Sequence, residues 1–273
     1  MKLKWIFALT LFAAIASASR ATTVTISGID DYNHSGWSGC TNPSCSGGFG
    51  HAAFGVANIT GGAPYTIDGS SLRFDLIDNG TCPNHTNCYS NALFWYVLNQ
   101  PVNQTNAATA ITLDFYAMMD SAGSNNSEAA EFTVNQVVCT ASCGTANETL
   151  TRYIYSMQCD FKNTGVWKIW DGQDQGPPSH GSWVPTNHNC VPFQPNSFNH
   201  FVMHFTRPNS NQIHYVDFQI NGTTYPLNIN AQPEIWPNTN APSKFEASAQ
   251  LDGDYFGHGY SLWIDKWIIS YTY

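Results

Sequence analysis

Glu131, Thr133 and Asn135 have side chains that can contact sugar hydroxyls, and they stand at every second position of the chain. The residues between them, Phe132 and Val134, are apolar. This alternation predicts a β-strand with one face in a core and the other open to a polar ligand. Side chains on one face of a strand follow at steps of about 7 Å, which suits contacts along a sugar ring. The pattern indicates glycan contact and leaves cleavage or binding open.

Other residues extend this predicted carbohydrate-binding surface. Gln158 adds an amide, and Trp95, Trp170 and Trp37 add flat apolar faces that match a pyranose ring. A few convergent polar groups among aromatic rings are what a sugar site requires. For Trp37 a second role fits as well, because a tryptophan in this loop can close one end of a sandwich.

The same alternation recurs along most of the chain. It predicts further strands at residues 23–27, 71–77, 91–98, 110–120, 152–159, 166–170, 198–206, 212–220, 223–229, 244–251 and 262–271. Residues 123–128 predict a polar hairpin turn, and the proline-containing residues 171–189 predict a long irregular loop. With no helix, linker or repeat predicted, residues 22–273 are expected to form a single all-β domain, a sandwich of two antiparallel sheets.

The first residues carry an export signal. Residues 1–21 combine a basic start, a short apolar run and small residues at the end, which is typical of a secretory signal peptide. The apolar run is too short to span a membrane. We therefore expect a secreted protein, either extracellular or in the cell envelope or periplasm, without membrane insertion.

The charge of the chain narrows its partners. Loss of residues 1–21 removes Lys2, Lys4 and Arg20 and changes the formal net charge from −9 to −12. Such a chain is a poor ligand for nucleic acid or an anionic membrane. It is equally unsuited to strongly anionic polysaccharides, so the expected partner is a neutral oligo- or polysaccharide.

The chain has eight cysteines, an even number that in an exported protein indicates disulfides. Pairing in sequence order gives Cys40 with Cys45, Cys82 with Cys88, Cys139 with Cys143, and Cys159 with Cys190. Their intervals do not match zinc knuckles, and the histidines show no metal-ligand spacing, so no catalytic metal is predicted. Asp252 and Asp254 in a glycine-rich turn offer oxygen ligands for a structural calcium ion, although two aspartates supply too few oxygens for a complete site.

Short motifs spread over most of the chain resemble the concanavalin A-like lectin/glucanase superfamily, and in particular secreted bacterial β-sandwich modules of unassigned activity. The motifs lie at residues 37–40 (Trp-Ser-Gly-Cys), 91–95 (Asn-Ala-Leu-Phe-Trp), 131–136 (Glu-Phe-Thr-Val-Asn-Gln), 158–160 (Gln-Cys-Asp), 167–171 (Trp-Lys-Ile-Trp-Asp), 183–185 (Trp-Val-Pro), 250–253 (Gln-Leu-Asp-Gly) and 260–265 (Tyr-Ser-Leu-Trp-Ile-Asp). The resemblance implies a concanavalin A-like jelly-roll β-sandwich with a concave sheet that faces a glycan.

Within this superfamily, laminarinase-type glycoside hydrolases carry Glu-x-Asp-x-x-Glu or Glu-x-Asp-x-Glu on a concave strand. The resemblance places Glu131 at the nucleophile, whereas Thr133 replaces the middle aspartate and Asn135 or Gln136 stands at the acid/base position. An amide can neither attack the sugar nor protonate the leaving oxygen, and retaining hydrolysis needs two carboxyl groups for these steps. A hydrolase would therefore need a distant partner for Glu131, for which the choices are Asp252, Asp254 and Asp160.

Four hypotheses remain from the sequence. Carbohydrate binding without cleavage leads, because the second carboxylate of the motif is missing, and a glycoside hydrolase that uses Glu131 follows. A polysaccharide lyase is indicated only by Gln212, Ile213 and His214, a short match to alginate-lyase-type jelly rolls. In a purely structural module, the charge of Glu131 would be neutralised by Arg152 across the sheet.

Overall fold

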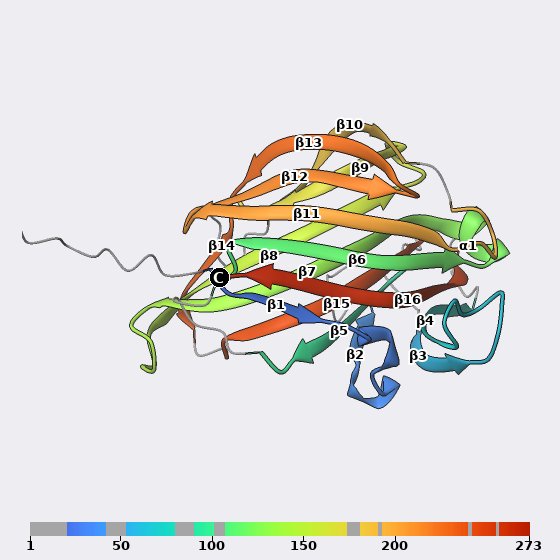
Figure 1. Cartoon of the computed structure of the whole chain (residues 1–273), viewed down its shortest axis with the longest axis horizontal. Helices are drawn as coiled ribbons and strands as arrows, with labels where there is room; N and C mark the ends of the chain where they lie inside the picture. Colours follow the sequence, from blue (N-terminus) through green and yellow to red (C-terminus); the bar gives the residue numbers. More distant parts are fainter. Residues whose placement is uncertain are drawn as a thin grey trace, which may run out of the picture.

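The computed structural model describes residues 21–41, 53–79, 90–100, 107–173, 181–190, 193–239, 242–254 and 257–273. In these residues the strands form two antiparallel sheets that pack face to face (Figure 1). The predicted concanavalin A-like jelly-roll sandwich is therefore confirmed. The expected signal peptide lies almost entirely in residues 1–20, outside the described part.

The strand order brings segments together that are distant in sequence. Sheet A has the order β13 (Thr223–Ala231), β12 (Gln212–Ile220), β11 (Asn199–Asn209), β6 (Ala110–Met119), β16 (His258–Thr272), β4 (Ser70–Asn79) and β3 (Ala53–Thr60), with β1 (Thr23–Ile26) also on β16. Sheet B has the order β10 (Ser182–Asn189), β9 (Val166–Asp171), β8 (Glu148–Asp160), β7 (Ser127–Ala141), β15 (Lys244–Gly253), β5 (Asn91–Leu98) and β2 (Ser38–Thr41), with β14 (Glu234–Thr239) also on β8. The described residues also form three short helical segments: η1 (Ile29–Asp31), η2 (His34–Gly36) and α1 (Ser121–Asn126).

The core lies between the sheets and is rich in aromatic rings. Phe132 of β7 packs on Phe115 of β6, with ring centroids 4.5 Å apart, and Phe115 stacks on Phe201 of β11 at 5.3 Å. All three side chains are fully buried. Because side chains alternate along a strand, burial of Phe132 places its neighbours Glu131 and Thr133 on the opposite face of sheet B.

The structure corrects the loop predicted at residues 171–189. Residues 182–189 form strand β10, which pairs with β9 so that Trp183 lies opposite Trp170 and Pro185 opposite Lys168. Proline donates no backbone hydrogen bond and is tolerated on edge strands. Since β10 ends the order of sheet B, Pro185 can lie in a strand that the sequence did not indicate.

A second correction concerns the turn predicted at residues 123–128, where the structure has helix α1 followed directly by β7. The Asp120 side chain accepts a hydrogen bond from the Gly123 backbone N–H at 2.6 Å and so caps the helix. Strands β2, β3 and β14 were also not predicted from the sequence.

Two of the four predicted disulfides are confirmed. Cys139 is bonded to Cys143, and Cys159 of β8 is bonded to Cys190, directly after β10. The predicted partners Cys45, Cys82 and Cys88 lie outside the described residues, while Cys40 lies in β2.

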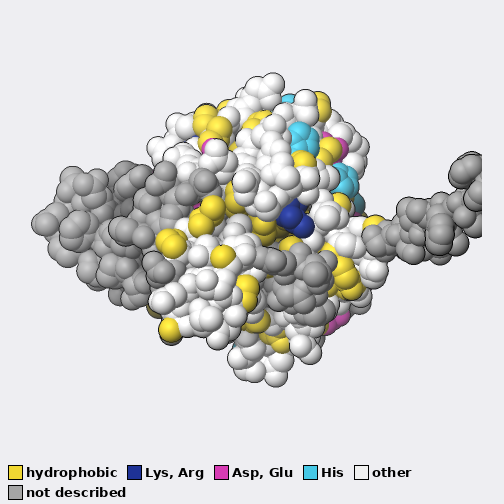
Figure 2. All heavy atoms as spheres, turned by 90° about the vertical axis from the view of Figure 1, so that its left-hand side faces the viewer, with side chains coloured by type: hydrophobic (Ala, Val, Ile, Leu, Met, Phe, Trp, Pro, Cys, Tyr) yellow, Lys and Arg dark blue, Asp and Glu magenta, His cyan; other side chains and the backbone are white. Residues whose placement is uncertain are grey.

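The helices are short, and few basic side chains are expected on the surface, because the sequence has only ten Lys and Arg residues. Among the described residues, none of the helices is long and apolar enough to cross a membrane. Figure 2 shows one end of the sandwich, where apolar side chains are scattered and few basic ones are visible.

The aromatic core should dominate stability. Replacing Phe132 with Ala removes a fully buried ring between the two sheets and should lower the free energy of unfolding by about 3–5 kcal/mol. Val97→Ala is the matched control, because Val97 is 52% exposed in the same sheet, and its effect should stay within about 0.5 kcal/mol. Urea unfolding followed by tryptophan fluorescence measures both, and equal effects of the two changes would contradict this account of the core.

Candidate functional site

The pairing of strands in sheet B places a row of polar side chains across its outer face. Gln250 of β15 lies opposite Glu131 of β7, which lies opposite Gln158 of β8. Gln158 in turn lies opposite Lys168 of β9. Each of these residues alternates with core residues on its own strand, so the four side chains share one face.

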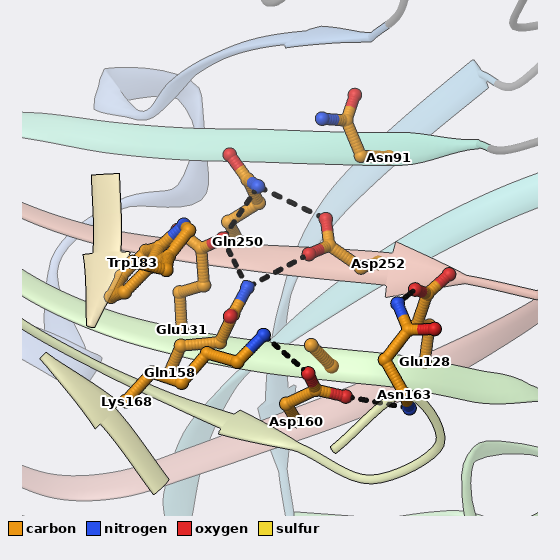
Figure 3. A pocket seen from close by; sticks show the side chains of 11 residues that line it. Asn91, Glu128, Glu131, Gln158, Asp160, Asn163, Lys168, Trp183, Gln250 and Asp252 are labelled. Atoms are coloured by element: carbon orange, nitrogen blue, oxygen red, sulfur yellow. Dashed lines mark hydrogen bonds and ion pairs between the residues drawn. The ribbon is translucent and has the colours of Figure 1, made fainter. Parts of the chain in front are cut away.

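These side chains line a pocket of about 540 Å³ (Figure 3). The residues around it are Asn91, Glu128, Ala129, Glu131, Gln158, Asp160, Asn163, Lys168, Trp183, Gln250 and Asp252. They come from strands β5, β7, β8, β9, β10 and β15 and from the turn after β8. In Figure 3, Trp183 lies on one side of Glu131 and Gln158, and Asn91 lies beyond Asp252.

Two amide groups connect the carboxyl groups of Glu131 and Asp252. Nε2 of Gln158 donates to Glu131 Oε1 at 2.9 Å and to Asp252 Oδ2 at 3.3 Å. Nε2 of Gln250 donates to the same Glu131 oxygen at 2.8 Å and to Asp252 Oδ1 at 3.0 Å. The two carboxyl groups therefore lie within the reach of a single amide nitrogen, on the same side of the sheet.

This arrangement changes the acidity of Glu131. Burial raises the pKa of its carboxyl group well above the ordinary value of 4.5, and the negative charge of Asp252 raises that pKa further. Hydrogen bonding from Gln158 and the positive charge of Lys168 lower the pKa, but these effects are smaller than those of burial and Asp252. Glu131 thus tends to keep a proton under conditions in which an exposed glutamate has lost it.

Asp160 has the opposite tendency. Burial alone raises its pKa, but the ion pair with Lys168, at 2.5 Å, and hydrogen bonds from the Asn163 backbone and the Thr164 hydroxyl outweigh burial and lower the pKa overall. The pocket therefore combines a carboxyl group that favours the protonated form with a carboxylate that favours the charged form.

Aromatic and charged side chains continue the site beyond the pocket. Trp183 packs edge-on against Trp170, with ring centroids 5.2 Å apart. The indole N–H of Trp170 donates to Glu234 at 3.2 Å, and Arg152 pairs with the other oxygen of Glu234 at 3.3 Å. Arg152 thus pairs with Glu234, so the ion pair with Glu131 that the sequence suggested for a structural role of that glutamate is not formed.

The predicted site residues divide into three groups. Glu131, Gln158 and the proposed partner Asp252 meet in the pocket. Thr133 and Asn135 lie on the same face of β7 but outside the pocket lining, where Thr133 shares a hydrogen bond with Ser156.

None of the three predicted tryptophans is among the residues that line the pocket. Trp95 lies opposite Ser248, and Trp170 is the neighbour of Trp183. Trp37 is 7% exposed and stacks on Trp267 in the core, so it has the alternative role considered for it, that of a packing residue.

Sequence reasoning missed Gln250, Lys168, Trp183 and Asn91. Gln250 and Asn91 occupy alternate positions in strands that were predicted, so a systematic listing of polar faces would have included them. Trp183 was assigned to a loop. Lys168 was recognised only as part of a motif, because nothing in its local sequence shows that it pairs with Asp160.

Two minor hypotheses concern other residues. Asp254 pairs with Lys162 and His258, at 3.7 and 2.9 Å, while Asp252 accepts from the two glutamines. A calcium ion between these aspartates stays a prediction. His214 belongs to β12 of sheet A and shares a hydrogen bond with Asn230, so the tripeptide that indicated a lyase lies outside the pocket.

Comparison with known proteins gives similarity in structure only. No protein-family model matches the chain, and no curated protein matches it. The solved structures that are similar include "Cellulose induced protein, Cip1", with 13% identity, a TM-score of 0.45 and coverage of 90% of this chain and 96% of that one. An alginate lyase from Chlorella virus has 11% identity, a TM-score of 0.40 and coverage of 80% and 91%. An endo-β-galactosidase from Clostridium perfringens has 10% identity, a TM-score of 0.42 and coverage of 92% and 62%.

The electrostatic interaction between the carboxyl groups of Glu131 and Asp252 can be measured directly. Asp252→Asn removes the negative charge beside Glu131 and should lower the pKa of Glu131, which burial still keeps above 4.5. Titration of the Glu131 side-chain carboxyl by carbon NMR measures this shift. Asp217→Asn in sheet A is the matched control and should leave the pKa of Glu131 unchanged. An unchanged Glu131 pKa in Asp252→Asn would show that the two groups do not interact.

The raised pKa also affects stability. A carboxyl group that binds its proton more tightly in the folded state contributes stability at low pH and loses it as the pH rises through the folded pKa. Glu131 should therefore destabilise the protein progressively above about pH 4.5. Glu131→Gln should abolish this loss, so that the variant gains stability over the original protein between pH 4.5 and neutral pH. Chemical unfolding across this pH range is the measurement, and parallel curves for the two proteins would contradict it.

Proposed function

We propose that the protein is a secreted glycoside hydrolase that holds a neutral oligosaccharide in the pocket of sheet B. The observation that carries the proposal is the Asp252 carboxyl group beside Glu131, both joined by the amides of Gln158 and Gln250. The sequence alone lacked a second carboxyl group at strand spacing from Glu131. The fold supplies it from β15, the strand next to β7.

The two carboxyl groups have different roles in this proposal. Glu131, with its raised pKa, donates a proton to the glycosidic oxygen as the bond from that oxygen to the anomeric carbon breaks. The carboxylate of Asp252 attacks the anomeric carbon and forms a glycosyl ester. Water then replaces Asp252 and returns a proton to Glu131, which completes hydrolysis with retention.

These roles reverse the one that the resemblance gave to Glu131, where it matched a nucleophile. The environment supports this assignment, because burial and a neighbouring negative charge favour a proton on Glu131. The closeness of the groups also supports the retaining route, since an inverting pair must leave space for a water molecule between the carboxyl groups and the sugar.

The charge of the pocket lining supports a neutral sugar as the substrate, and the disulfides support a location outside the cytosol. Four acidic residues, Glu128, Glu131, Asp160 and Asp252, line the pocket against one lysine, Lys168. An anionic sugar would meet repulsion from this lining, so a neutral sugar fits better. The Cys139–Cys143 and Cys159–Cys190 disulfides are consistent with an oxidising compartment outside the cytosol.

Hydrolysis should depend on both carboxyl groups. We expect the mature protein to release reducing ends from a neutral polysaccharide, tested over a panel of soluble glucans, galactans and xylans. Glu131→Gln and Asp252→Asn should each lower the rate by at least about a hundredfold, because each removes a proton donor or a nucleophile. Asp217→Asn, which alters a half-buried aspartate of sheet A, should keep the original rate.

A second candidate is carbohydrate binding without cleavage. It is favoured by the same network, because both carboxyl groups already accept two amide hydrogen bonds each, an arrangement that also suits fixed contacts to sugar hydroxyls. Glycan retention without release, weakened by Glu131→Gln, would overturn the hydrolase in favour of this binding module. If the protein neither retains nor cleaves any glycan of the panel, both candidate functions are rejected.

A further inference from the structure

A second group of acidic side chains lies in a different part of the fold. Asp30 belongs to η1, Asp68 to the turn before β4, and Asp265 to β16 of sheet A. One carboxylate oxygen from each lies within 4.8 Å of the others. The three residues are far apart in sequence, and none of them lines the pocket of sheet B.

Two of these aspartates are buried. Asp265 is 0% exposed and Asp30 is 1% exposed, whereas Asp68 is exposed. A buried carboxylate is costly unless a positive charge or several hydrogen bonds compensate it. None of the ion pairs found in the described part of the chain involves any of the three.

Backbone N–H groups donate hydrogen bonds to the two buried carboxylates. The Ile67 N–H donates to Asp265 Oδ2 at 2.5 Å, and the Trp267 N–H donates to Asp30 Oδ1 at 2.7 Å. The second oxygen of Asp265, Oδ1, is buried and has no hydrogen-bond partner among the described residues. A buried acceptor without a donor is rare in folded proteins and calls for a ligand that the protein itself does not provide.

The three carboxyl groups also affect one another. Burial raises the pKa of Asp265 to about 6, and the charges of Asp68 and Asp30 contribute to this increase. Burial also raises the pKa of Asp30. The repulsion among these closely spaced carboxyl groups is what a bound cation would relieve.

We propose that Asp30, Asp68 and Asp265 bind a calcium ion that fastens η1 and the turn before β4 to strand β16. Calcium prefers carboxylate oxygens at 2.3–2.6 Å, so ligand atoms on opposite sides of the ion lie about 5 Å apart. The spacing of the three oxygens fits this range. Asp68 supplies the exposed side of the site, and the buried Oδ1 of Asp265 supplies its inner ligand.

The ion would join two segments to the strand at the middle of sheet A. β16 pairs with both β6 and β4, and it carries β1 along its end. A ligand that binds only the folded state increases its stability in proportion to the logarithm of ligand concentration. Calcium would therefore raise the unfolding temperature without contacting the pocket.

The test uses the mature protein after treatment with a chelator. Isothermal titration with calcium chloride should show one ion bound per chain, and the unfolding temperature should rise with added calcium and fall again with chelator. Terbium, which replaces calcium, should show luminescence sensitised by Trp263 or Trp267, the tryptophans two residues from Asp265.

Variants locate the site. Asp68→Ala alters an exposed ligand and should fold normally, while its calcium affinity should fall by about tenfold or more. Asp265→Asn should abolish the calcium-dependent rise in unfolding temperature, and without calcium it should be more stable than the original protein because a buried charge is gone. Asp252→Asn and Asp217→Asn should bind calcium like the original protein. No binding at millimolar calcium, or unchanged affinity in Asp68→Ala, would overturn the proposal whatever the outcome for the glycan pocket.

Discussion

The alternation of side chains along β7 is the constraint on which the rest of the molecule depends. Phe132 and Val134 are fully buried between the sheets, and this burial fixes Glu131 and Thr133 on the outer face. A slip of one residue in the pairing of β7 would exchange the two sets and place the glutamate in the aromatic core. The same hydrophobic contacts that stabilise the sandwich therefore also determine which side chains can meet a ligand.

Register then converts this alternation into a site. The pairing of β15, β7 and β8 brings Gln250 and Gln158 to either side of Glu131. Paired strands hold side chains more precisely than loops do, since each position is fixed by backbone pairing on both sides. The amides orient Glu131 and Asp252 before any ligand arrives, and burial separates the tendency of Glu131 to hold a proton from that of Asp160.

Local pattern was sufficient to predict most of the strands, the two-sheet architecture and the polar face of β7, because all of these follow from a period of two residues. It could not give the strand order, and so it could not show that Asp252 lies beside Glu131 although 121 positions separate them in the chain. Position 185 illustrates the other limit. Proline argues against a strand in general, yet an edge strand such as β10 accepts it, and only the sheet order identifies an edge.

The two acidic groups show how the same fold deals differently with buried charge. In the pocket, side-chain amides from neighbouring strands surround Glu131 and Asp252, and one group can remain protonated at little cost. Around Asp265 the compensation comes from backbone N–H groups, and within the described part of the chain one oxygen is left without a partner. Amides are neutral and leave a carboxyl group free to exchange a proton, whereas a cation would fix the carboxylate in its charged form. The first environment suits chemistry on a substrate, and the second suits the joining of distant segments.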